Sequence, residues 1–389
     1  MYKIRTYNAI SSKGLERFPA DSYQVSSECA DPVGVLLRSQ KLHNEVMPES
    51  VVAVARAGAG TNNIPTADYT EQGIVVFNTP GANANAVKEL IVASLLMGSR
   101  DIYGGMNYVQ GLTDITDSAE MGQLLEKEKK RFAGGEVQGK TLGVIGLGAI
   151  GSMIANLALE LGMDVIGYDP AISVEAAWQL SSNVERMDSI EALLSRSDFV
   201  TLHVPAIAAT KHLINSKTLS IMKSTAKILN FAREEIVSTA DMVEALEKGV
   251  IGGYITDFPT PDLLGRKEVL LMPHIGASTA EAEENCAVMA ANQLMDFLEN
   301  GNIRNSVNYP QIKMARNGGT RITFTNKNVP KVLSNVLSIL SDSNLNVVDM
   351  VNKSRDEIAY NIIDIEGDFD ASLQDKISAV DGVVHVRLI

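Results

Sequence analysis

The sequence predicts an α/β protein with two doubly wound parallel-sheet domains, followed by a small C-terminal sandwich. Short β-rich runs alternate with helix-like segments from residue 33 to residue 273. This alternation is typical of parallel sheets that are covered by helices on both faces. The pattern changes at Gly318–Gly319, beyond which the order of elements is β-α-β-β-α-β. With 389 residues, the chain is also long for a single core and suggests two or three domains.

Composition narrows the class of protein. The chain is 45% hydrophobic and 21% charged, as is usual for soluble globular proteins. Its net charge of −13 makes nucleic acid and acidic membranes unfavourable partners. Cys29 and Cys286 lack metal or redox spacing and cannot form a disulfide framework. The first residues contain no apolar signal core, and the longest apolar stretch is too short to span a bilayer, so we expect a cytoplasmic protein.

The β-rich runs of the two expected sheets form two series. The first series contains VGVLLR from Val33, VVAVARA from Val51 and IVVFNT from Ile74. The pattern NAVKELIVASLLMGSRDIYGG, which begins at Asn85, then predicts a helical segment. The second series contains TLGVIG, DVIGYD, FVTLHVP, AKILNFA, GGYITDF and VLLMP.

A long helix is expected after the second series. STAEAEENCAVMAANQLMDFLENG opens with a capping box, Ser278 with Glu281, and stops at Gly301. Beyond the linker candidate Gly318–Gly319, the strand TRITFTN precedes the helix VPKVLSNVLSILSDSN. The strands NVVDMVNKS and IAYNIIDIEG, the helix ASLQDKISAV and the strand VVHVRLI follow. This order predicts a ferredoxin-like sandwich.

A dinucleotide-binding motif lies at the start of the second series. Gly146, Gly148 and Gly151 form the pattern G-x-G-x-x-G between a strand and an amphipathic helix. In this pattern the first glycine permits a tight turn, the second admits the pyrophosphate and the third allows close packing of helix on sheet. Asp169 ends the next strand and would bind the ribose hydroxyls, while no adjacent arginine awaits a 2′-phosphate. NAD is therefore favoured over NADP.

Three polar residues follow strands of the second series, where parallel sheets collect ligands. They are Arg233, Asp257 and His274, and a further acid, Asp262, lies close behind Asp257. Oxidation of a 2-hydroxy acid needs a guanidinium to clamp the carboxylate, an imidazole to take the hydroxyl proton and a carboxylate to orient that imidazole. This set fits that reaction. His203 is a rival base, ranked below His274.

The motifs GLGAIG, YDP, HVP, NFAR, TDFP and PHIGAST resemble those of the D-isomer-specific 2-hydroxyacid dehydrogenases. The resemblance covers nearly the whole chain. It implies a substrate-binding domain of residues 1–97 and 285–312, an NAD-binding Rossmann domain of residues 98–284, and an active site in the cleft between them. It assigns the catalytic arginine to Arg233 and the catalytic histidine to His274.

The family's catalytic acid is normally a glutamate, and the matching position, counted without gaps, holds Asp262. Asp262 is therefore expected to orient His274, with Asp257 as the alternative because aspartate is one methylene shorter. The expected NAD-binding residues are Gly146, Gly148, Ala149, Ile150, Gly151, Asp169, His203, Phe231, Ala232, Asp257 and Gly276.

The resemblance also suggests a substrate. Arg38, Ser39 and Arg56 match positions that hold a phosphorylated substrate, and Gly58 and Asn83 match less closely. The expected reaction is the oxidation of 3-phospho-D-glycerate to 3-phosphohydroxypyruvate with NAD, the first step of L-serine synthesis. Two alternatives remain open, another enzyme of the family such as a glyoxylate or hydroxypyruvate reductase, and a non-enzymatic protein that senses NAD.

The C-terminal sandwich, residues 318–389, resembles the ACT domain, a regulatory module that binds amino acids. The resemblance implies that Asn326, Asn328 and Asn346 bind an L-serine effector. Asn326 stands where a histidine is common, and Lys331 stands where glycine is usual. The alternative is a domain that only dimerises the protein. In either case a homodimer or homotetramer is expected.

Overall fold

The computed structural model describes residues 1–370 and 372–389, and contacts within the chain divide it into two compact units. Unit 1 contains Met1–Asn83 and Thr279–Ile389, and unit 2 contains Ala84–Ser278. The first division, after Asn83, precedes the expected boundary at residue 97 because α3 (Ala84–Ser99) packs into the core of unit 2. The second, after Ser278, precedes the expected boundary at residue 284 because α11 (Ala280–Asn300) packs on the strands of unit 1.

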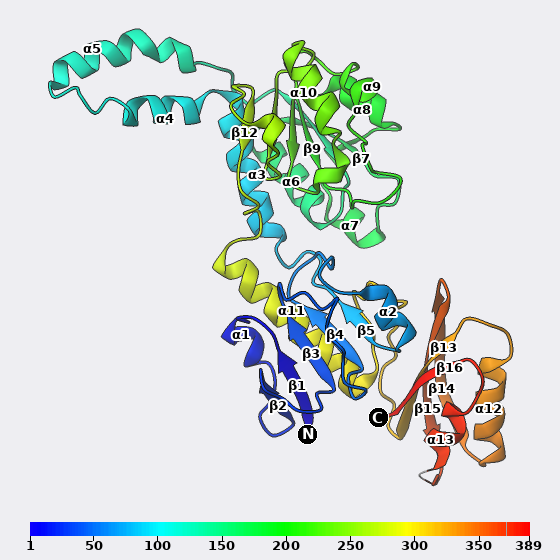
Figure 1. Cartoon of the computed structure of the whole chain (residues 1–389). Helices are drawn as coiled ribbons and strands as arrows, with labels where there is room; N and C mark the ends of the chain where they lie inside the picture. Colours follow the sequence, from blue (N-terminus) through cyan, green and yellow to red (C-terminus); the bar gives the residue numbers. More distant parts are fainter. Residues whose placement is uncertain (371) are drawn as a thin grey trace. The chain divides into compact units, whose positions relative to one another are not determined.

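Unit 1 is built on a five-stranded parallel sheet in the order β2-β1-β3-β4-β5 (Figure 1). Its strands are β1 (Tyr2–Thr6), β2 (Tyr23–Ser26), β3 (Gly34–Leu37), β4 (Ala53–Arg56) and β5 (Val75–Phe77). The short helices α1 (Ser12–Leu15) and α2 (Thr66–Glu71) connect them. The strands β3, β4 and β5 confirm the first predicted series. The sequence did not reveal β1, in which Ile4 is the one buried residue.

The long helix α11 (Ala280–Asn300) packs on this sheet, with contacts to β3, β4 and β5. Its N-cap is Thr279, whose hydroxyl accepts a hydrogen bond from the Ala282 amide at 3.1 Å. The predicted capping box, Ser278 with Glu281, was therefore wrong by one residue, because Thr279 has the extended backbone that brings its hydroxyl to that amide. The predicted stop is confirmed, since Gly301 ends the helix in the left-handed conformation, with φ of 69°.

The C-terminal sandwich has the predicted order of elements and an antiparallel sheet, β14-β15-β13-β16. Its elements are β13 (Thr320–Lys327), α12 (Val332–Asp342), β14 (Asn346–Arg355), β15 (Ile358–Glu366), α13 (Ser372–Ser378) and β16 (Val383–Leu388). Ala371, the first residue of the predicted second helix, lies outside the described residues. Ile358, Tyr360 and Ile362 of β15 belong to the same core as Phe297 and Leu298 of α11. The sandwich therefore shares its core with the rest of unit 1.

Unit 2 contains a seven-stranded parallel sheet in the order β12-β11-β10-β9-β6-β7-β8. The strands are β6 (Thr141–Ile145), β7 (Asp164–Tyr168), β8 (Glu185–Arg186), β9 (Phe199–Leu202), β10 (Lys227–Asn230), β11 (Gly253–Thr256) and β12 (Val269–Leu271). The helices are α6 (Ala149–Glu160), α7 (Val174–Gln179), α8 (Ile190–Arg196), α9 (Ser216–Leu219) and α10 (Thr239–Glu247). The second predicted series is confirmed, with the two-residue β8 added.

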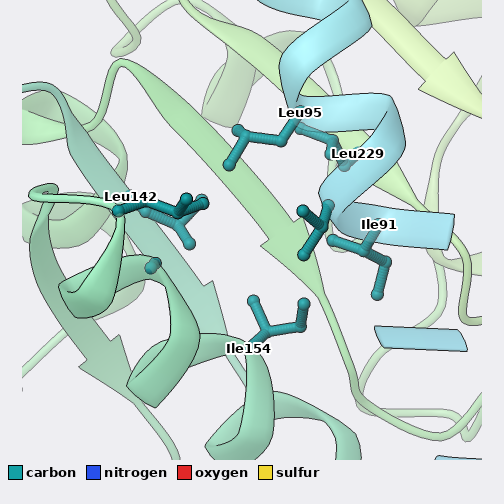
Figure 2. A pocket seen from close by; sticks show the side chains of 8 residues that line it. Ile91, Leu95, Leu142, Ile154 and Leu229 are labelled. Atoms are coloured by element: carbon teal, nitrogen blue, oxygen red, sulfur yellow. The ribbon is translucent and has the colours of Figure 1, made fainter. Parts of the chain in front are cut away.

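Aliphatic side chains fill the space between α3, α6 and this sheet (Figure 2). Ile91 and Leu95 of α3 face Leu142, Ile154 and Leu229 around a gap of about 10 Å³. A gap of this size is too small for a ligand and has no polar lining. It is a packing defect of the core.

The predicted helical segment after Asn85 is interrupted at Asp101, whose carboxylate caps a second helix, α4 (Ile102–Gln110). With α5 (Ser118–Glu128) and the 3-10 turn η1 (Lys129–Phe132), α4 forms an arm that extends from unit 2 (Figure 1). None of the residues of these three elements is buried. In the part of the chain that the structure describes, no helix is long and apolar enough to cross a membrane.

Candidate active site

The glycine-rich turn between β6 and α6 has the geometry that a dinucleotide site requires. Gly146 has a φ of 90°, and a Cβ there would lie 2.6 Å from the carbonyl oxygen of His203. A Cβ on Gly151 would lie 1.9 Å from the carbonyl oxygen of Gly146. Both positions therefore exclude a side chain. Around Gly148, by contrast, no heavy atom of the described residues lies within 4 Å of a Cβ, which leaves space for a ligand.

The predicted ribose ligand, Asp169, lies beside this turn. Its Oδ2 accepts a hydrogen bond from the Leu147 amide at 2.8 Å, and its Oδ1 accepts one from the Ala171 amide at 2.9 Å. No side chain among the described residues caps α6, so the first amides of the helix, including those of Ala149 and Ile150, remain for an anion. These residues fit the pyrophosphate and ribose of a dinucleotide.

His203 follows β9 on the same edge of the sheet. Burial lowers the pKa of its imidazole to about 3, and its Nε2 lies 2.9 Å from the Thr201 hydroxyl oxygen. The ring is therefore neutral at physiological pH and holds a proton too weakly for an effective general base. This agrees with ranking His203 below His274 as the base.

Arg233 is positioned by a buried asparagine at the end of β10. Asn230 Nδ2 donates to the carbonyl oxygen of Arg233 at 2.9 Å, and Asn230 Oδ1 accepts from the Ala232 amide at 3.2 Å. Tyr254 and Thr256 of β11 hold Asn230 in turn. Phe231 packs into the core of unit 2, so the loop that carries Arg233 is fixed from both sides.

Asp257 is a buried acid at the end of β11. Burial raises the pKa of its carboxyl, while His274, the Gly276 amide and Arg233 act to lower it. Its Oδ2 accepts from the Gly276 amide at 3.3 Å, and its Oδ1 is buried without a hydrogen-bond partner among the described residues. An acid, an imidazole and a guanidinium thus lie close enough to influence one another.

His274 itself is exposed, and its ring packs against Phe258 with 4.9 Å between the ring centres. Asp262, the acid that the sequence favoured, is exposed and lies in the 3-10 turn η3 (Pro261–Leu263). Its carbonyl oxygen accepts from Arg266 Nε at 2.8 Å, which fixes the backbone of the turn. The charge of His274 acts on the carboxyl of Asp257, which lies at the buried end of β11.

The substrate-binding candidates lie in unit 1. Asn8 Oδ1 accepts hydrogen bonds from the backbone amides of Ser39 and Gln40. These two amides, which follow β3, are therefore already paired within the chain. Arg38 Nη2 lies 2.8 Å from Glu283 Oε1 of α11. Arg56 folds over Gly58, where a Cβ would lie 2.4 Å from the guanidinium.

Asn83, the remaining substrate candidate, is the last residue of unit 1, directly before α3. A hollow of about 650 Å³ in unit 1 is lined by Gly81, Ala82 and residues of α11 such as Asn292, together with Arg304. It contains none of the predicted substrate-binding residues.

The predicted regulatory residues have different surroundings. Asn326 is buried, donates to the Lys327 carbonyl oxygen and accepts from Asn361 Nδ2 at 2.8 Å. Asn328 and Asn346 are exposed. Lys331 has a φ of 75°, the left-handed conformation in which glycine is usual. The backbone at this position thus keeps a glycine-like conformation with a lysine side chain.

Sequence reasoning missed Asn230, Thr256 and Glu283. Asn230 and Thr256 each end a hydrophobic strand directly before a candidate residue, and this position was an available signal. Glu283 could not have been found, because it is 245 residues from Arg38 in sequence and lies among other acids in α11.

Comparisons with known proteins place these features in a family. Residues 105–276 match the family model described as "D-isomer specific 2-hydroxyacid dehydrogenase, NAD binding domain". The chain is 32% identical to a D-3-phosphoglycerate dehydrogenase of Haemophilus influenzae, over 87% of this chain and 81% of that protein. It is 31% identical to the enzyme of that name from Escherichia coli K12, over 95% of this chain and 90% of that protein.

A solved structure is also similar. The 3-phosphoglycerate dehydrogenase of Entamoeba histolytica with bound NAD+ has a TM-score of 0.61 and 26% identity. The similarity covers 80% of this chain and 99% of that one.

Proposed function

Because the chain belongs to the D-isomer specific 2-hydroxyacid dehydrogenase family, we propose that it oxidises 3-phospho-D-glycerate to 3-phosphohydroxypyruvate with NAD. The observation that carries the proposal is the group formed by Arg233, Asp257 and His274 in the unit that bears the glycine-rich turn. The relatives named D-3-phosphoglycerate dehydrogenase support the choice of substrate.

Each reacting group has one role in the proposal. Arg233 binds the substrate carboxylate through two parallel hydrogen bonds, for which guanidinium geometry is suited. His274 takes the proton of the 2-hydroxyl group on its ring nitrogen. A carboxylate stabilises the imidazolium that forms. Bound NAD supplies the hydride acceptor.

The orienting carboxylate is assigned to Asp257 or Asp262. The sequence resemblance favours Asp262, whereas the electrostatic influence of His274 and Arg233 on the Asp257 carboxyl favours Asp257. A buried carboxylate can hold an imidazolium with little screening by water. We therefore prefer Asp257, and paired variants separate the two assignments.

The cofactor is assigned to one set of residues and the substrate phosphate to another. The NAD-binding residues are those predicted above, from Gly146 to Gly276. The phosphate is assigned to Arg38, Ser39 and Arg56, with Gly58 and Asn83 beside them. Two guanidinium groups suit a dianionic phosphate.

The test is the rate of NADH formation, followed by absorbance, with 3-phospho-D-glycerate, D-glycerate, D-lactate and 2-hydroxyglutarate. The proposal expects the highest kcat/KM for 3-phospho-D-glycerate. A preference for D-glycerate or D-lactate would instead favour another dehydrogenase of the family. No turnover of any of these acids would favour a protein that binds NAD without reaction.

Regulation and assembly are further parts of the proposal. Inhibition by L-serine would act through Asn328 and Asn346, which are exposed, rather than through Asn326, which is buried and uses both its amide nitrogen and its amide oxygen in hydrogen bonds. A homodimer or homotetramer would cover α4, which exposes Tyr103, Met106 and Val109. Rates with and without L-serine, and the molar mass in solution from light scattering, test these two points.

A further inference from the structure

Glu283 of α11 forms an ion pair with Arg38, one of the two arginines assigned to the substrate phosphate. Arg38 follows β3, and Glu283 lies in the first turn of α11. Their side chains form an ion pair, with 2.8 Å between Arg38 Nη2 and Glu283 Oε1, and are 39% and 43% exposed. Since both groups are within reach of solvent, an incoming anion can compete with Glu283 for Arg38.

Cys286 lies one turn further along α11, where its thiol is influenced by Arg38, Arg56 and Glu283. Its thiol pKa is raised by burial, lowered by Arg38 and Arg56, and raised by Glu283. The two guanidinium groups and the carboxylate therefore act on the same small region of unit 1. There the formal charge of the three groups is one positive, whereas the arginines alone would give two.

The neighbouring acid provides a contrast on the same helix. Glu284 pairs with Lys13 of α1, at 2.5 Å, and so joins two helices that pack together. An acid in the first turn of a helix also complements the helix dipole, which by itself would explain Glu283 as a stabilising residue. Glu284 is the next residue of the same helix and pairs outside the Arg38 region, so it serves as a control for the loss of one negative charge.

We propose that Glu283 determines substrate specificity by competing with the charged tail of the substrate for Arg38. The inference rests on the proposed assignment of Arg38 to that tail. A phosphate dianion must displace the carboxylate and then remain near it, so the repulsion grows with the charge of the tail. Glu283 thus weakens binding of a doubly charged tail more than binding of a singly charged tail, and leaves a neutral tail unaffected.

The test compares Glu283→Gln with Glu284→Gln in steady-state assays of NADH formation. Glu283→Gln should lower KM for 3-phospho-D-glycerate by about two- to fivefold, as expected for removal of an exposed charge contact. It should lower KM less for 2-hydroxyglutarate and leave KM for D-glycerate unchanged. The value of kcat should stay within about twofold for all three, because Glu283 acts on binding and not on proton transfer. Glu284→Gln should change none of these values.

An equal change of KM for D-glycerate and 3-phospho-D-glycerate would refute the proposal, because a purely structural role affects all substrates alike. The same effect in Glu284→Gln, or no effect in Glu283→Gln, would refute it as well.

If the wild type turns over none of these acids, the proposed function fails, and calorimetric titration with 3-phospho-D-glycerate still tests the inference. Tighter binding in Glu283→Gln alone would support it, and equal affinities in all three proteins would contradict it.

Discussion

At the scale of single residues, two histidines on one sheet edge have opposite surroundings. His203 is partly buried, and burial lowers its pKa to about 3, whereas His274 is exposed and packs on Phe258. A base must both accept a proton and reach the substrate. These surroundings favour His274 for proton transfer. The ring of His203 is uncharged and lies beside the glycine-rich turn.

The first prediction concerns His274. His274→Ala should lower kcat by about a hundred- to ten-thousandfold, because the variant lacks the group that accepts the hydroxyl proton. The affinity for NAD, measured by calorimetry, should change little, since the glycine-rich turn and Asp169 remain. His43→Ala, which removes another exposed imidazole, is the control and should retain normal turnover. Near-normal turnover in His274→Ala would remove this residue from the mechanism.

The second prediction separates the two acids. Asp257→Asn should lower kcat by about a hundredfold or more, because an amide cannot stabilise the imidazolium as a carboxylate does. Asp262→Asn should retain most activity. The reverse result would assign the orienting role to Asp262, as the sequence resemblance favoured.

Asp257→Asn should also affect stability, with a sign set by the pKa shift. Burial raises the pKa of Asp257 in the folded protein, so the folded state binds this proton more tightly than the unfolded chain. Ionisation of Asp257 therefore costs stability as pH rises through its folded-state pKa. The free energy of unfolding, measured by urea denaturation, should therefore fall with rising pH in the wild type relative to Asp257→Asn. The difference between the two proteins should be smallest in acid, where Asp257 is protonated. A free energy of unfolding of Asp257→Asn that falls relative to that of the wild type as pH rises would contradict this prediction.

At the scale of elements, α11 is held at its C-terminal end by two arginines of the sandwich. Arg387 donates to the carbonyl oxygens of Phe297 and Leu298, and Arg321 donates to that of Asn300. Cations at these carbonyls complement the negative end of the helix dipole. Arg321 is fully buried and also forms a two-pronged ion pair with Asp364, with N–O distances of 2.6 and 2.8 Å. The sandwich and α11 are thus joined by buried polar contacts.

The third prediction tests this junction. Arg321→Met should reduce the free energy of unfolding by about 3–5 kcal/mol, because it leaves the Asp364 carboxylate buried without its partner. Arg321→Met combined with Asp364→Leu should recover part of the loss. Arg316→Ala, which removes an exposed arginine near the same segment, is the control and should cost less than about 1 kcal/mol. A loss in Arg321→Met no larger than in the control would show that the buried pair contributes little.

How far the elements follow from sequence depends on how strongly they are buried. The strands β9 and β11 are buried along their length, and β10 is buried from Ile228 onward, so their β-rich and largely apolar runs predicted them. β1 is half-exposed and contains Lys3 and Arg5, so it lacks that signal.

The same limit applies to the sites. The glycine-rich turn, Arg233 and His274 belong to local motifs and could be predicted. The burial of Asp257 and the pairing of Arg38 with Glu283 depend on tertiary contacts that no local pattern contains. The burial of Arg321 is another example, because an arginine in a strand is usually exposed.

At the scale of the whole molecule, the chain passes between its two units twice, at residues 83–84 and 278–279. Unit 2 is one continuous segment, whereas unit 1 combines both ends of the chain. The sequence suggested a separate C-terminal module after Gly318–Gly319. In the structure, Tyr360 of that module packs near Phe297 and Tyr309, with ring centres 6.4 and 6.1 Å apart. Loss of the module should therefore affect unit 1 directly.

The last prediction follows from this shared core. A chain that ends at Asn317 should show a lower melting temperature for the transition of unit 1, because the truncation removes Tyr360, Arg321 and Arg387 from the packing around α11. Unit 2 should keep its transition and its affinity for NAD, measured by scanning and titration calorimetry.

In the full chain, Tyr360→Ala should destabilise the transition of unit 1 by about 3 kcal/mol, the usual cost of emptying a buried aromatic site. Val348→Ala, on the exposed part of β14, should not destabilise it. Unchanged transitions in the truncated chain would instead show that the rest of unit 1 does not depend on the sandwich for its stability.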